Sequence, residues 1–292
     1  MKGLKVSVMA VLGVAIAAAN MSEAAERSFD VEVVGQGKPM ILIPGLNSSP
    51  AVWADLQAHY QKNYQLHLVH INGFAGNPLN GEASLNQVKV DLLDYIDDKN
   101  LSKPIMMGHS LGGFVSLWVA SSQPEQTGEL IIIDSLPFFP LAFNPMATEA
   151  SMQPMAEQQR QGILNSPEQG RLQYYQQSLP GLVSEASDVE TIIEWSMSSD
   201  PKMTGQAMYE MFTTDLRDEI ADIRSPALVL GSWTVAKDMG GTMDTVRHNF
   251  SVQYENVPDV TIKMHSSAKH FIMLDDPQWT IEAIDSYLHH QP

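Results

Sequence analysis

The sequence contains no cysteine and is poor in basic residues. The absence of cysteine excludes disulfide bonds, thiolate catalysis and cysteine-ligated metal sites. Only 17 lysine and arginine residues stand against 34 aspartate and glutamate residues, which leaves a formal net charge of -17. A surface with this balance repels nucleic acid and anionic membranes. We therefore predict neither as a partner.

Long hydrophobic runs are also missing, apart from one short run near the N-terminus. Residues 6–19 are apolar, Lys2 and Lys5 precede them, and small residues follow up to Ala24. This layout is typical of a secretory signal peptide, and the run is short for a transmembrane span. We predict that residues 1–24 are a signal peptide and that the mature protein is periplasmic or secreted, without a stable membrane span. The alternative is an uncleaved N-terminal membrane anchor.

Strand-like and helix-like segments alternate along most of the remaining chain, which at 292 residues is long enough for one large core. Strands are predicted at residues 28–34, 39–43, 64–71, 104–107, 130–133, 227–230 and 260–264. Helices are predicted at residues 51–59, 84–97, 114–120, 242–255 and 277–289. Such alternation is typical of an α/β protein with a mostly parallel, doubly wound sheet that has helices on both faces.

The alternation stops between residues 136 and 220. This region is rich in Met, Gln, Ser and Pro, contains no convincing strand and has helical character. We therefore predict a core formed by residues 25–135 and 221–292, with residues 136–220 inserted between two strands of one sheet.

The segment Gly108-His109-Ser110-Leu111-Gly112 carries the strongest functional signal. It matches the G-x-S-x-G nucleophile elbow, in which a sharp turn between a strand and a helix exposes a serine hydroxyl. An apolar strand-like run precedes the motif and a helical pattern follows it, as the elbow requires. Ser110 is therefore the predicted nucleophile.

Together with two further motifs, the elbow resembles the α/β-hydrolase superfamily. The matching segments are Ile41-Leu42-Ile43-Pro44-Gly45-Leu46, Gly108-His109-Ser110-Leu111-Gly112-Gly113, and Lys269-His270-Phe271-Ile272-Met273-Leu274-Asp275-Asp276-Pro277. The resemblance covers nearly all of the chain after residue 24. It implies that residues 136–220 form a helical cap over the active site, and that the site uses a serine, a histidine and an acid.

The resemblance indicates His270 as the base, because it follows the last strand as the family's histidine does; His265 is the alternative. The acid is either Asp134, at the end of the strand 130–133, or Asp238, in the loop after the strand 227–230, and Asp134 is preferred.

The family also implies an oxyanion hole made by the backbone N–H groups of Leu46 and Leu111. Phe74 and Trp233 lie in loops expected to face the same cleft, which makes them candidate substrate-binding residues. Asp275 and Asp276 are predicted to cap the last helix. This chemistry requires no metal and no organic cofactor.

These residues predict a serine hydrolase acting on a small-molecule substrate, namely a small to medium carboxylic ester or lactone. The methionine- and phenylalanine-rich insertion suits a substrate with an apolar group. An amide, peptide or C–C bond hydrolase would use the same triad, and a non-catalytic binding protein on a hydrolase scaffold is a further alternative. No oligomeric state is predicted.

Overall fold

A computed structural model of the chain describes residues 27–237 and 240–289. The predicted signal peptide and Asp238 lie outside the described residues. Seven strands form one sheet in the order β1-β3-β2-β4-β5-β6-β7. They are β1 (Phe29–Gly35), β2 (Lys38–Ile43), β3 (Tyr64–Ile71), β4 (Ile105–His109), β5 (Leu130–Ile133), β6 (Ala227–Gly231) and β7 (Val260–Met264). Only β1 is antiparallel to its neighbour, which confirms the mostly parallel sheet.

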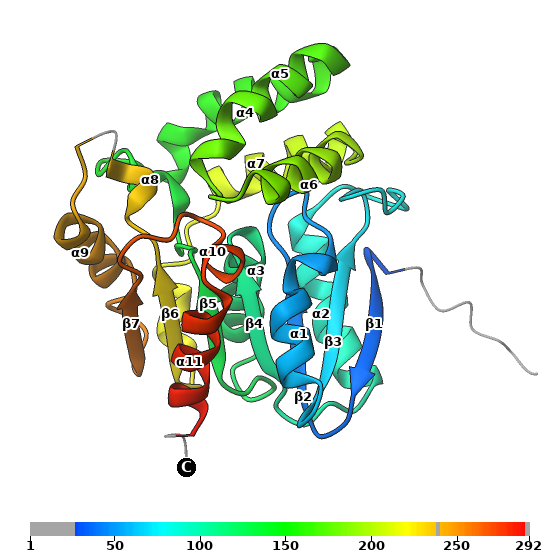
Figure 1. Cartoon of the computed structure of the whole chain (residues 1–292), viewed down its shortest axis with the longest axis vertical. Helices are drawn as coiled ribbons and strands as arrows, with labels where there is room; N and C mark the ends of the chain where they lie inside the picture. The colour runs from blue at the N-terminus through cyan, green and yellow to red at the C-terminus, as the bar shows by residue number, and fades with distance from the viewer. Residues whose placement is uncertain (1–26, 238–239, 290–292) are drawn as a thin grey trace, which may run out of the picture.

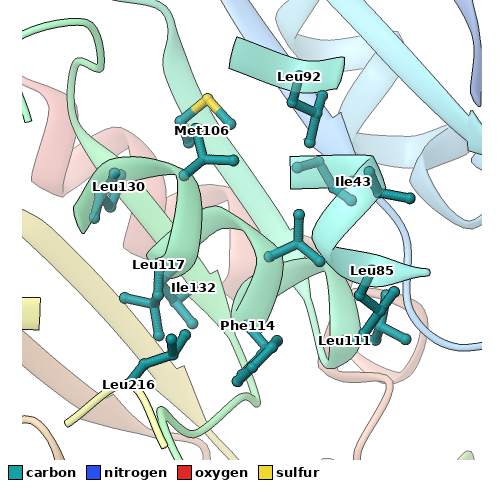
Figure 2. Packing of buried hydrophobic residues seen from close by; sticks show 14 of the residues in the cluster. Ile43, Leu85, Leu92, Met106, Leu111, Phe114, Leu117, Leu130, Ile132 and Leu216 are labelled. Carbon is teal, nitrogen blue, oxygen red and sulfur yellow. The ribbon is translucent and has the colours of Figure 1, made fainter. Parts of the chain in front are cut away.

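Helices cover both faces of this sheet, as the strand patterns predict (Figure 1). On one face lie η1 (Pro50–Trp53), α1 (Ala54–Tyr60) and α11 (Pro277–Leu288). On the other lie α2 (Leu85–Asp98), α3 (Leu111–Ser122) and α9 (Met243–Gln253). Figure 2 shows Leu111, Phe114 and Leu117 of α3 packed among residues of the strands that this second helical layer covers.

The central strands are apolar at every position because both of their faces are buried. In β5, Leu130 and Ile132 pack toward α3, whereas Ile131 and Ile133 pack on the opposite side. All four side chains have 0% exposed surface. A strand buried in this way reads as a continuous hydrophobic run, which is why the sequence predicts it without alternation.

Between β5 and β6 the chain forms a helical unit, which we call the cap (Figure 1). Its elements are η2 (Phe139–Ala142), α4 (Glu149–Asn165), α5 (Glu168–Ser178), η3 (Leu179–Gly181), α6 (Ala186–Met197), α7 (Pro201–Thr213) and η4 (Glu219–Asp222). Part of its apolar content is used for its own packing, because Phe138, Met152 and Phe212 form a separate buried cluster there.

The cap contacts the loops at the C-terminal ends of the parallel strands. Thr204 on α7 bonds Asn47, which follows β2, and the backbone N–H of Asp200 bonds the carbonyl of Gly73, which follows β3. The short helices α8 (Thr234–Lys237) and α10 (Ile272–Asp275) complete the fold. Within the ranges that the structure describes, no helix has both the length and the hydrophobicity of a membrane span.

Candidate active site

Ser110 occupies a sharp turn between β4 and α3. Its backbone has φ 52° and ψ -120°, a conformation that L-residues rarely adopt outside over-determined sites. The turn is held by a hydrogen bond of 2.9 Å from the Ser110 N–H to the carbonyl of Ile133 on β5. Ser110 precedes the first residue of α3, so it lies at the positive end of the helix dipole.

Two glycines make this turn possible. A Cβ atom on Gly108 would lie 2.2 Å from the carbonyl oxygen of Gly112, and one on Gly112 would lie 2.0 Å from the carbonyl oxygen of Ile43. Real Cβ atoms do not approach backbone oxygens so closely, so neither position can accept a side chain without moving the backbone. The glycines of the motif therefore allow β2, β4 and α3 to meet directly beneath Ser110.

His270 is paired with Asp134. The distance between His270 Nδ1 and Asp134 Oδ2 is 2.6 Å, and the side chains are 21% and 11% exposed. Asp134 follows β5 with φ 45°, and its Oδ1 accepts a hydrogen bond of 2.7 Å from the backbone N–H of Ser232. A carboxylate held in this way fixes the orientation and the tautomer of the imidazole. Among the sequence candidates, the structure thus brings Asp134 to His270.

His265 has a different environment. Its Nδ1 accepts backbone hydrogen bonds from Ser267 at 3.1 Å and from Ala268 at 2.6 Å, and its Nε2 lies 3.1 Å from Asp276 Oδ2. Both ring nitrogens are thus used within the segment between β7 and α11. The side chain is 7% exposed. These contacts shape the loop that leads to His270.

His109 links the elbow to the histidine loop. Its Nε2–H donates to the backbone carbonyl of His270 at 3.1 Å, and the two ring centroids are 4.6 Å apart. Burial lowers the pKa of His109 well below its usual range, and the nearby His270 acts in the same direction. His109 is therefore neutral near pH 7, and it binds the backbone of His270 at the residue that precedes Ser110.

The predicted oxyanion-hole residues belong to two segments that adjoin the serine, the start of α3 and the turn after β2. Leu111 is the first residue of α3, where backbone N–H groups have no partner within the helix. Leu46 lies in a turn closed by a hydrogen bond of 3.1 Å from the Ser48 N–H to the Gly45 carbonyl. A Cβ on Gly45 would lie 3.3 Å from Ser110 Cβ, so this turn runs directly past the nucleophile.

Asn47, next to Leu46, has a role that the sequence analysis missed. It has φ 57°, and its side chain is 3% exposed. Its Oδ1 accepts a hydrogen bond of 2.7 Å from Thr204 on α7, and its Nδ2 donates to the Tyr175 hydroxyl of α5 at 3.2 Å. The turn that carries Leu46 is therefore attached to two helices of the cap. Asparagine tolerates a left-handed backbone conformation better than most residues. Its presence in this turn is the one feature of the sequence that points to position 47.

The prediction that Phe74 binds substrate is wrong for this structure. Its side chain has 0% exposed surface and belongs to the hydrophobic core. The loop that contains it is covered by the cap, because a Cβ on the adjacent Gly73 would lie 2.6 Å from Cβ of Met203 on α7. Trp233 is half-buried, and its indole N–H donates to the carbonyl of Ser266 at 2.9 Å. This bond attaches Trp233 to the segment before His270. The contact of Trp233 with substrate stays a prediction.

These features define a class of α/β proteins with a nucleophile elbow. In this class a strained serine lies between a parallel strand and a helix, and segments that follow other strands supply a histidine–carboxylate pair. The model of the alpha/beta hydrolase family matches residues 40–283. The chain belongs to this family.

Curated relatives match a smaller part of the chain. The pimeloyl-(acyl-carrier protein) methyl ester esterase of Aeromonas hydrophila subsp. hydrophila is 33% identical over 114 residues, which are 38% of this chain and 43% of the relative. The protein of that name from Shewanella woodyi is 31% identical over 113 residues, which are 38% of this chain and 41% of the relative. The chain thus matches less than half the length of these relatives.

Solved structures match nearly the whole chain at low identity. A thermophilic esterase from Thermogutta terrifontis superposes with a TM-score of 0.70 at 18% identity, over 89% of this chain and 93% of that one. The enol-lactonase from Burkholderia xenovorans LB400 superposes with a TM-score of 0.72 at 14% identity, over 90% and 96% of the two chains. At this identity the likeness establishes the fold.

Proposed function

We propose that this protein is a serine hydrolase that cleaves a small to medium carboxylic ester or lactone with an apolar group. The observation that carries the proposal is the pairing of His270 with Asp134 at 2.6 Å. The carbonyl of His270 also accepts a bond from His109, the residue before Ser110, which is held in the elbow conformation. The names of the relatives, which include a methyl ester esterase and an enol-lactonase, agree with this substrate class.

The proposed mechanism assigns one task to each of these groups. His270 Nε2 takes the proton of Ser110 Oγ while the oxygen attacks the substrate carbonyl, and Asp134 stabilises the imidazolium that forms. The N–H groups of Leu46 and Leu111 bind the oxyanion of the tetrahedral intermediate. Its collapse breaks the ester bond, and His270 returns the proton to the leaving alkoxide. Water, deprotonated by His270, then attacks the acyl-enzyme. His270 returns this proton to Ser110 Oγ as the acyl–oxygen bond breaks and the acid leaves.

The substitution Ser110→Ala tests this proposal. We expect wild-type protein to hydrolyse p-nitrophenyl esters, with a rate that depends on acyl length. The Ser110→Ala variant should lose about 10⁴-fold or more in kcat, because the residual rate comes from binding and the oxyanion hole alone. Ser122→Ala provides a matched control, since this exposed serine of the same helix donates to the Trp118 carbonyl and should be dispensable.

A fluorophosphonate probe separates the other outcomes. Labelling of Ser110 without hydrolysis of any ester in the series would move the proposal to an amide, peptide or C–C substrate. Folded wild-type protein that is neither labelled nor active would contradict an enzymatic role and favour a binding protein.

We further propose that the protein is exported through residues 1–24. The support is the basic start, the short apolar run and the small residues that follow it. Cell fractionation should find the full-length gene product outside the cytoplasm, shortened at its N-terminus, whereas a version without residues 1–24 should stay inside. Equal distributions for the two versions would contradict export.

A further inference from the structure

The loop that carries His270 is bonded to the cap through the preceding residue. Lys269 Nζ donates to the carbonyl oxygens of Pro180 at 2.7 Å and Val183 at 3.0 Å. Both acceptors belong to residues 179–184, which we call the cap turn. They are backbone atoms, so the bonds depend on where the turn lies and not on its side chains. The bond to Val183 is partly buried whereas the bond to Pro180 is exposed, so solvent screens the bond to Val183 less.

The residues that follow His270 contact the same turn. The backbone N–H of Phe271 donates to the carbonyl of Leu182 at 3.1 Å. The carboxylate of Asp275 accepts bonds of 2.8 Å from both the backbone N–H and the hydroxyl of Ser184, and one of 2.8 Å from the backbone N–H of Lys269. The histidine is thus flanked on both sides by bonds to the cap turn.

The opposite side of His270 faces the elbow, where its carbonyl accepts the bond from His109. The backbone of His270 is therefore held between an element of the rigid sheet and an element of the cap. Loss of the cap contacts would leave the bonds to His109 and Asp134 as the direct bonds to His270 itself, beside the bonds that hold the segment before it. A displacement of about 1 Å at a catalytic group can cost roughly 100-fold in rate.

We propose that Lys269 is a positioning residue, which holds His270 in place by fastening its loop to the cap turn. The general base is then in position when the cap turn is seated, so the cap takes part in assembling the catalytic site as well as covering it. The rate effects rest on the proposed hydrolase function. The position of His270 can be measured without it.

The substitution Lys269→Met tests this inference, because it keeps the aliphatic stem and removes the ammonium group. We expect kcat for a p-nitrophenyl ester to fall about 10- to 100-fold with KM changed less than about twofold. Lys263→Met is the matched control. Lys263 lies on β7 and its Nζ donates to the Ala283 carbonyl at 3.4 Å, so the change removes the same charge and the same kind of bond away from the cap. The control should keep kcat, and both variants should show similar Tm values.

Repeating the Lys269→Met substitution in a His270→Ala variant separates positioning of His270 from general stabilisation of the protein. If Lys269 acts through His270, then Lys269→Met should cause no further loss of residual hydrolysis or of slow fluorophosphonate labelling in the His270→Ala variant. An equal loss in both backgrounds would overturn the inference, and so would an unchanged kcat in Lys269→Met.

Proton NMR gives a readout that does not require turnover. The proton shared by His270 Nδ1 and Asp134 should give a low-field resonance, assigned by its loss in His270→Ala. We expect Lys263→Met to retain this resonance and Lys269→Met to lose or shift it. An unaltered resonance in Lys269→Met would overturn the positioning role. Inactive wild-type protein that still shows the resonance would contradict the hydrolase proposal alone.

Discussion

Replacing Asp134 with asparagine is expected to lower kcat about 10⁴-fold with little change in KM. The amide cannot stabilise the imidazolium that forms when His270 accepts the serine proton. It also offers an N–H group to the ring nitrogen that now faces a carboxylate, which favours the wrong tautomer. The bond of 2.6 Å between Asp134 Oδ2 and His270 Nδ1 therefore carries the prediction.

Steady-state kinetics on Asp134→Asn and Asp238→Asn compares the two sequence candidates directly. Asp238→Asn should keep nearly full activity. A large loss in that variant with a nearly active Asp134→Asn would show that the acid comes from the segment after β6. Chemical denaturation of each variant should accompany the kinetics, because Asp134 also accepts the bond from the Ser232 N–H.

A second large effect is expected on stability, from Gly112→Ala. The new Cβ would lie 2.0 Å from the Ile43 carbonyl oxygen and 2.6 Å from that of Pro44, so α3 and the end of β2 must separate. We expect the free energy of unfolding to fall by roughly 3 kcal/mol, as in strongly overpacked cores. Activity should fall as well, because the turn that follows β2 carries Leu46.

Gly162→Ala is the control for this substitution. Gly162 lies inside α4, and a Cβ at this position would have nothing within 4 Å. Alanine there should raise the free energy of unfolding by about 0.5–1 kcal/mol, because glycine is the poorer helix former. Urea unfolding of both variants measures the difference, and a Gly112→Ala protein as stable as wild type would contradict the close approach.

The features predicted best are those that local sequence determines. Strands such as Leu130–Ile133 are continuous apolar runs because two helical layers bury them, and that pattern is visible without a structure. The elbow was equally visible, since the strained turn requires glycine at positions 108 and 112. Asp276 was predicted as a helix cap, and its side chain accepts the Trp279 N–H at 3.0 Å.

The features predicted poorly depend on where the cap lies against the core. The position of Phe74 in a loop predicts that it faces the cleft, but α7 covers that loop and buries the side chain. Asp275 has the same sequence context as Asp276, yet it binds Ser184 of the cap turn. Asn47 and Lys269 likewise find their partners more than 80 residues away, and no local pattern encodes such pairs.

The position of Asp134 has a consequence for engineering the protein. Ser110 and Asp134 follow neighbouring strands, so a single β–α–β unit of the chain supplies two of the three groups of the proposed triad. The segment after β6 then contributes only its first residues, with Ser232 and Thr234 bonded to the Ala268 carbonyl. Under the proposed mechanism no triad group comes from the part of this segment beyond Thr234. Lengthening or randomising it is therefore expected to leave Ser110, Asp134 and His270 in place.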